Sequence, residues 1–137
     1  MTAATQLIDL RVSCRLGIYF DALAIPAGAP QVVPSGTHGS RPARTMPEDF
    51  TEEAGQASDN VCEALRPAGA KLSGISQVRS WLTDRDDVDG YVTVRKDVIS
   101  HRPAYMLVLV PQLIRPGLLL EIEATAVVTQ AAAEQHE

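Results

Sequence analysis

Two glutamates inside an apolar stretch are the residues of this chain whose type and spacing best suit chemistry. The stretch covers residues 102–128, with Tyr105 near its start and Glu121 and Glu123 in its second half. Side chains alternate between faces along a β-strand, so Glu121 and Glu123 share one face and Ile122 points to the other. A carboxylate at the mouth of a cleft can act as a general base, whereas one on a wet sheet face is only solvated. Spacing alone leaves both interpretations open.

A glycine-rich turn, Ser35-Gly-Thr-His-Gly39, supplies the other polar candidates. It follows an expected strand over residues 31–35, and loops placed by a rigid strand often carry functional groups. His38 has the chemistry of a catalytic base, and the hydroxyl of Ser35 can donate a hydrogen bond. The alternatives are a solvated histidine and a hydroxyl that caps a turn.

Composition limits the function classes. The 137 residues, 45% of them hydrophobic, suit one domain over residues 1–137 with frayed ends at 1–7 and 131–137. A net charge of -5 gives no basic footprint, so we expect no nucleic-acid partner. No apolar run reaches the roughly 20 residues that span a bilayer and no leader segment is visible, so we expect no membrane partner and a cytoplasmic location. Cys14 and Cys62 are expected in the core, and the histidines lack metal-ligand spacing, so we expect no metal and no cofactor.

The elements that position the candidates follow from hydrophobic periodicity. Alternating apolar residues predict a strand over residues 8–24 that breaks near Gly17, whereas spacings of three and four predict helices. The first helix should begin at the N-cap Asp49 and stop at Gly69, and the second should follow the N-cap Asp87 and end before Pro103. The remaining predicted elements are strands over 31–35 and 75–83 and two strands within 102–128 joined by a turn.

The order β-β-α-β-α-β-β predicts an α+β fold in which both helices cover one face of a single sheet. Trp81 is expected in its core. Apolar residues remain for the opposite face, and proteins usually hide such a face by forming oligomers.

Several stretches together resemble the reactive intermediate deaminase family, also called the Rid or YjgF family. The resemblance extends from about Gly17 to Val128. The matching motifs are Gly17-Ile-Tyr19, Val33-Pro-Ser-Gly36, the helix pattern from Gln56 through Asn60 to Gly69, Leu82-Thr-Asp84, Pro103-Ala104 and Glu121-Ile-Glu-Ala124. The family implies a chorismate-mutase-like fold and homotrimers with a central barrel. It also implies three clefts between subunits, where enamines and imines of 2-amino acids are hydrolysed.

The resemblance favours a catalytic role for Glu121, because it matches the carboxylate that helps to place the attacking water. Tyr105 and Ser35 are then expected to donate hydrogen bonds to developing negative charge. The residues expected to contact the substrate are Tyr19, Gly36, Thr37, His38 and Arg102.

The chain departs from its relatives at Tyr105. Deaminating members have Pro-Ala-Arg where this chain has Pro103-Ala104-Tyr105, and that arginine binds the substrate carboxylate. Each charge-assisted hydrogen bond contributes about 1.5–3 kcal/mol, which a neutral phenol does not replace. Arg102 lies an odd number of positions away, so an extended chain aims it at the opposite face.

We therefore expect hydrolysis, dehydration or cyclisation of a small enamine, imine or carbonyl intermediate that lacks the carboxylate, as in a tailoring step of biosynthesis. The alternative is a ligand-binding or regulatory trimer without turnover.

Overall fold

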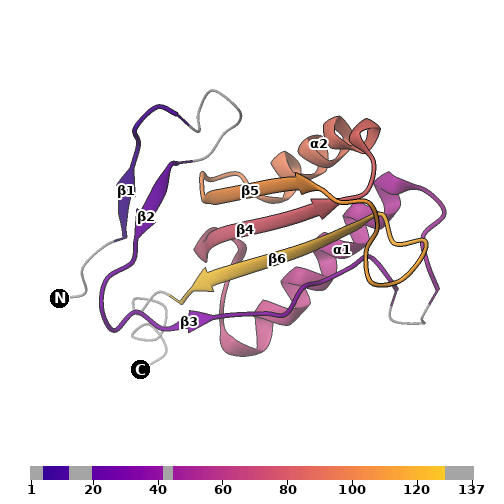
Figure 1. Cartoon of the computed structure of the whole chain (residues 1–137). Helices are drawn as coiled ribbons and strands as arrows, with labels where there is room; N and C mark the ends of the chain where they lie inside the picture. The colour runs from indigo at the N-terminus through magenta and orange to yellow at the C-terminus, as the bar shows by residue number, and fades with distance from the viewer. Residues whose placement is uncertain (1–4, 13–19, 42–44, 129–137) are drawn as a thin grey trace.

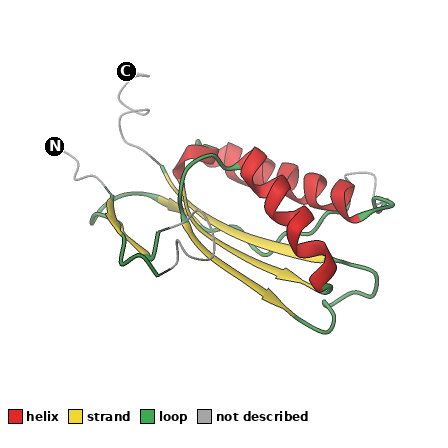
Figure 2. Ribbon diagram, turned by 90° about the horizontal axis from the view of Figure 1, so that it is seen from above, coloured by secondary structure: helices red, strands yellow, loops and turns green. Residues whose placement is uncertain are grey.

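The computed structural model describes residues 5–12, 20–41 and 45–128. Its main body is a four-stranded sheet of order β3-β6-β4-β5 (Figure 1). Both helices lie on one side of this sheet (Figure 2). The elements are β3 (Gln31–Val32), α1 (Phe50–Leu65), β4 (Ile75–Leu82), α2 (Val88–Val98), β5 (Ala104–Leu109) and β6 (Leu120–Val127). The predicted α+β fold is confirmed. Neither helix in the described part of the chain is long and apolar enough to cross a membrane.

Helix α1 has the ends that its sequence predicts. The Asp49 carboxylate accepts the Glu52 N–H at 2.8 Å, and Gly69 ends the segment in the left-handed conformation, with φ of 77°. Its apolar stripe, from Ala54 to Leu65, is buried against the sheet.

Helix α2 begins differently from the prediction. Asp87 precedes the helix, but its side chain makes no capping hydrogen bond. A 3-10 turn over Arg85–Asp87 comes first, and the Asp84 carboxylate accepts the Asp86 N–H at 2.9 Å. The chain therefore caps this turn at Asp84 and continues from the turn into α2.

Strand β4 lies between β5 and β6, although β5 and β6 follow each other in sequence. It pairs parallel with β5, through the crossover helix α2, and antiparallel with β6. Along β6 the even-numbered residues Leu120 to Ala126 are buried under the helices, and Glu121, Glu123 and Thr125 are half-buried on the other face. The predicted alternation of faces is confirmed. We call the side without helices the open face.

The long strand predicted over residues 8–24 is wrong. The chain forms two short strands, β1 (Gln6–Ile8) and β2 (Ala22–Ala24), which pair in a separate antiparallel sheet. Asp9 turns the chain after β1, because its carboxylate accepts the Arg11 N–H at 2.9 Å and Arg11 has a positive φ of 61°.

Gln6 and Leu7, which were expected to be frayed, belong to β1. The break at Gly17, Cys14 and the end 131–137 lie outside the described residues.

Three further expectations change. Strand β3 is shorter than residues 31–35, since Pro34 has no N–H to donate and pairing with β6 resumes only at Thr37. Trp81 is half-buried on the open face, opposite Glu121, because its position in β4 alternates with the buried Ser80 and Leu82. Cys62 is a half-buried thiol on α1 whose pKa is raised by burial.

Candidate functional site

The Glu121 carboxylate lies against a backbone segment that has no side chain at the point of contact. A Cβ atom added to Gly36 would lie 2.9 Å from Oε1 of Glu121, closer than real Cβ contacts allow. Glycine at position 36 therefore lets the carboxylate rest on the chain. Trp81 is the direct neighbour of Glu121 across the β4–β6 pair.

The segment from Ser35 to Thr37 is held beside β6 by backbone hydrogen bonds. Thr37 exchanges two of them with Ile122, at 2.7 and 2.8 Å, and its hydroxyl donates to the Ser35 carbonyl at 3.2 Å. Ser35 and Gly36 are exposed. The structure thus brings Ser35, Gly36 and Thr37 to the strand that carries Glu121.

His38 is fixed to its own loop and to α1. Its Nδ1 accepts the Ser40 N–H at 3.3 Å, and its carbonyl accepts a hydrogen bond from the Asn60 amide at 2.9 Å. Asn60 also donates to the Ser40 carbonyl at 2.9 Å. The helix therefore sets the path of the loop that follows Thr37.

A buried glutamate that sequence reasoning missed supports the start of β6. Glu53, on α1, is 2% exposed, and its Oε2 accepts the N–H groups of Leu119 and Leu120 at 2.8 and 3.2 Å. Burial raises the pKa of Glu53, and the two N–H donors oppose that shift. A Cβ at Gly39 would lie 2.3 Å from the Glu53 carbonyl, so the loop also packs tightly here. The signal for Glu53 in the sequence is a charged residue three positions after Phe50, within the apolar stripe of α1.

Tyr105 lies on the opposite face of the sheet from Glu121. It pairs with Val78, whose side chain is buried under the helices, and it packs against the core. Burial raises the pKa of Tyr105, although the neighbouring Arg95 cation acts in the other direction. One subunit therefore does not bring Tyr105 and Glu121 together.

Arg95, on α2, is a second buried charge that sequence reasoning missed. It is 7% exposed, and its guanidinium carbon lies 4.1 Å from the centre of the Tyr105 ring. Among the described residues, no carboxylate lies within ion-pairing distance of it. A desolvated cation–π contact contributes about 2 kcal/mol, less than the several kcal/mol that burying a cation costs. The ring contact alone does not compensate this charge.

A pocket of about 210 Å³ lies beside Arg95 at the end of α2. Its lining residues are Arg95, Lys96, Ile99, Ser100, His101 and Tyr105. His101 is held in place because its Nε2 lies 2.8 Å from the carbonyl oxygen of Ile75. Among the described residues, this lining contains Arg95 and Lys96 and no carboxylate.

Arg102 is engaged elsewhere. Its Nη2 lies 3.7 Å from Oδ2 of Asp9, and its guanidinium stacks 3.9 Å from the centre of the Phe20 ring. These contacts attach the β1–β2 hairpin to the start of β5, where the Phe20 N–H also donates to the Pro103 carbonyl. Tyr19 lies outside the described residues.

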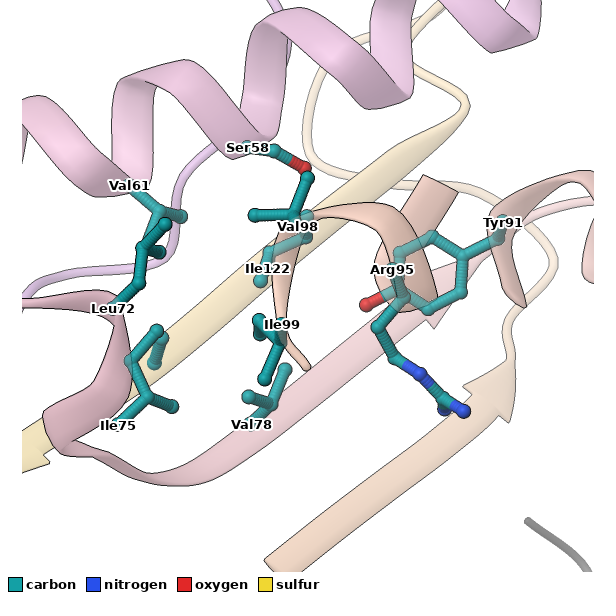
Figure 3. Close-up of a pocket in the computed structure, with 11 residues that line it drawn as sticks. Ser58, Val61, Leu72, Ile75, Val78, Tyr91, Arg95, Val98, Ile99 and Ile122 are labelled. Carbon is teal, nitrogen blue, oxygen red and sulfur yellow. The ribbon is translucent and has the colours of Figure 1, made fainter. Parts of the chain in front are cut away.

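A different cavity lies in the apolar layer between the helices and the sheet (Figure 3). Its volume is about 20 Å³, enough for roughly one water molecule, and side chains such as Val61, Ile75 and Ile122 line it. Figure 3 shows the Arg95 guanidinium directed away from these apolar groups. We interpret this cavity as a packing gap. In the described residues, no three His, Cys, Asp or Glu side chains are grouped to hold a metal ion.

Comparisons with known proteins give a consistent set of relatives. The family model described as Endoribonuclease L-PSP matches residues 19–128. No curated protein matches the chain significantly. The solved structure of Rv2704 from Mycobacterium tuberculosis, a member of the YjgF/YER057c/UK114 family, is 30% identical with a TM-score of 0.66, and the match covers 91% of this chain and all of that one.

Two further solved structures are similar. RidA from an Antarctic Psychrobacter is 27% identical with a TM-score of 0.69, and the match covers 93% of this chain and 99% of RidA. YyfB from Yersinia pestis, described as a member of the Rid protein family, has a TM-score of 0.77 at 20% identity, with 92% of this chain and all of YyfB covered. The last similarity shows the fold alone.

Proposed function

Since the chain belongs to the Rid/YjgF family, which the Endoribonuclease L-PSP model matches over residues 19–128, we propose that it is a small-molecule enzyme. Its chemistry is acid/base catalysis of hydrolysis, dehydration or cyclisation of an enamine, imine or carbonyl intermediate, as in a tailoring step of biosynthesis. The observation that carries this proposal is the Glu121 carboxylate, which lies on the open face against the bare backbone of Gly36.

In the hydrolysis of an imine, Glu121 places a water molecule and accepts its proton while the oxygen bonds to the imine carbon. The imine nitrogen takes up the proton that Glu121 received, as its double bond to carbon becomes single. Transfer of the adduct's hydroxyl proton to the nitrogen by way of Glu121 then breaks the C–N bond and releases ammonia and a carbonyl compound. The segment Ser35–Thr37 lies beside the strand that carries Glu121, and the Ser35 hydroxyl is the donor that we propose for the developing negative charge.

The cleft is proposed to lie between subunits, because one sheet carries Glu121 and Tyr105 on opposite faces. Strand β5 is an edge strand, so a second copy can approach Tyr105 along that edge. Apolar side chains also remain exposed on this strand, including Val108 at 37% and Leu109 at 38%. Exposed apolar groups on a sheet edge favour association, and a closed ring of three copies covers all the open faces.

RNA is not the substrate that we propose, although the family model is described as an endoribonuclease. The chain carries a net charge of -5, and its open face presents Glu121 and Glu123. A phosphate backbone requires clustered lysine and arginine side chains.

The function is tested by release of ammonia from imines. Amino-acid oxidases and amine oxidases generate a panel of imines in place, some with a carboxylate and some without one. The release of ammonia from each imine is compared between the protein and buffer alone. We expect at least one class to be hydrolysed about tenfold faster or more with the protein. If no imine in the panel is converted while these compounds still bind, the chain is a ligand-binding or regulatory trimer instead.

The assembly gives a second test. In light scattering coupled to size exclusion, the mass should be three times the 14.7 kDa of the chain. Val108→Asp, which puts a charge on the open face of β5, should shift the mass toward a single chain. Thr93→Asp, on the exposed side of α2, is the matched control and should leave the trimer intact. A wild-type monomer at micromolar concentration would contradict the shared cleft.

A further inference from the structure

We propose that Glu53, the buried acidic residue of α1, is a positioning residue that holds the Glu121 carboxylate against the backbone of Gly36. Glu53 acts through the two chain segments that carry these groups and does not itself react. The role of Glu121 as a base rests on the proposed function, whereas the positioning rests on contacts among the described residues.

The first observation is the contact between Glu53 and the strand that carries Glu121. The Glu53 Oε2 accepts the N–H groups of Leu119 and Leu120 at 2.8 and 3.2 Å, and β6 begins at Leu120, one residue before Glu121. The side chain of Glu53 is 2% exposed, so water does not compete for these hydrogen bonds. Glu53 therefore fixes the backbone directly next to Glu121.

The second observation is the edge of β6 on which this contact lies. Ile122 exchanges two backbone hydrogen bonds with Thr37 on the edge that faces the loop. N–H groups two residues apart point to the same edge of a strand, so the Leu120 N–H points to this edge as well. The Glu53 carboxyl group thus takes the place of a paired strand at Leu120 and continues the ladder that Thr37 begins.

The third observation is the contact between Glu53 and the loop that follows Gly36. A Cβ atom added to Gly39 would lie 2.3 Å from the Glu53 carbonyl oxygen and 2.6 Å from the Glu53 Cγ. The backbone of the loop therefore rests directly on Glu53. One residue of α1 contacts both the strand that carries Glu121 and the loop that carries Gly36.

These contacts close a ring with the contact between Gly36 and Glu121, where an added Cβ would lie 2.9 Å from Oε1. Removal of the Glu53 side chain releases the start of β6 and opens space under the loop. Asn60, also on α1, still holds the loop through the carbonyls of His38 and Ser40 at 2.9 Å. The expected result is a displaced carboxylate in a folded protein.

A residue with only a structural role would lower stability and leave the turnover of the folded protein unchanged. A positioning residue lowers kcat as well, because a displacement of about 1 Å at a reacting group can lower a rate by about 100-fold. The experiment must therefore separate kcat from stability.

The full-length assembled protein is compared with Glu53→Ala, Glu53→Gln and Leu65→Ala in the imine assay, well below all the melting temperatures. Glu53→Ala should lower kcat about tenfold or more with little change in KM. Glu53→Gln should restore most of kcat, because the amide oxygen can accept the same two N–H groups.

Leu65→Ala is the control matched in stability. Leu65 is 1% exposed at the far end of α1, so its truncation should lower the melting temperature to a similar extent. Its kcat should stay within about twofold of wild type, because distant sites act independently. Equal losses of kcat in Leu65→Ala and Glu53→Ala, or a Glu53→Gln variant as slow as Glu53→Ala, would overturn the proposal.

A second measurement needs no substrate. The backbone amide resonances of Gly36 and Glu121 should shift in Glu53→Ala and stay unchanged in Leu65→Ala. If Glu53→Ala does not fold, Glu53→Asp takes its place in both measurements, because its shorter side chain cannot reach Leu120 and Gly39 together. Wild-type resonances at Gly36 and Glu121 in the variant used would contradict the positioning.

The two proposals fail separately. Shifted resonances at Gly36 and Glu121 without turnover of any imine by wild type would remove only the proposed function. Turnover by wild type that Glu53→Ala or Glu53→Asp retains in full would remove only the positioning role of Glu53.

Discussion

Glu121→Gln is expected to lower turnover by about 100-fold or more and to leave the melting temperature within a few degrees of wild type. Loss of a general base typically reduces rates by about 10²–10⁴-fold, because water must then attack without transferring its proton to the enzyme. The amide has nearly the shape of the carboxylate, so contact with the backbone at Gly36 is kept. Ammonia release from the best imine of the panel and a thermal melt are the two measurements.

Glu123→Gln provides the matched control. Glu123 lies on the same face of β6, two residues further along, and its ion pair with Arg79 at 3.7 Å is solvent-accessible. Such pairs contribute about 1 kcal/mol or less, so this variant should fold normally and keep turnover within about twofold. Equal losses in both variants would mean that charge on the open face, and not a base at Glu121, supports activity.

Glu53→Ala should produce the largest loss of stability, about 3 kcal/mol of unfolding free energy and roughly 10 °C in melting temperature. The change leaves the N–H groups of Leu119 and Leu120 without their acceptor and opens a space between α1 and β6. Glu52→Ala is the control, because its exposed side chain only pairs with Arg41 at 3.5 Å. A melting temperature for Glu53→Ala close to that of the control would show that water replaces the carboxylate.

The pH dependence of the same residue has a defined sign. Burial raises the pKa of Glu53 above the ordinary value of 4.5 for this carboxyl, so its contribution to stability is fully present below that pH and is lost as pH rises through the raised pKa. Glu53→Gln has no such titration. The stability of wild type relative to Glu53→Gln should therefore fall as pH rises above 4.5, as thermal melts over a pH series can show. A relative stability that rises with pH would mean that the two N–H donors outweigh desolvation.

Local signals in the sequence predicted much of the fold. The caps of α1 at Asp49 and Gly69 depend on neighbouring residues, and the alternation around Glu121 depends only on strand geometry. The β1–β2 hairpin was missed because alternating apolar residues do not show where a chain turns, which here depends on Asp9 and Arg11. The separation of β5 from β6 by β4 is a long-range pairing that no local pattern contains.

The candidate site was predicted less completely. The family resemblance grouped Glu121 with the Ser35–Thr37 segment. The sequence alone does not show that Tyr105 faces away from Glu121, because the pairing of β5 and β6 with β4 decides the faces. Glu53 and Arg95 were missed for one shared reason. A charged residue within an apolar helical stripe resembles the edge of that stripe, and only tertiary packing shows that it is buried.

The opposed faces of the sheet have a consequence for how activity would depend on protein concentration. If Glu121 serves one cleft and Tyr105 the next, a chain on its own holds two halves of different sites and no complete one. Specific activity should then fall on dilution as copies dissociate. Chains that each lack one of these two residues could restore a working cleft when mixed, because the intact halves meet at one of the shared boundaries. Catalysis would be a property of the ring and not of the single polypeptide.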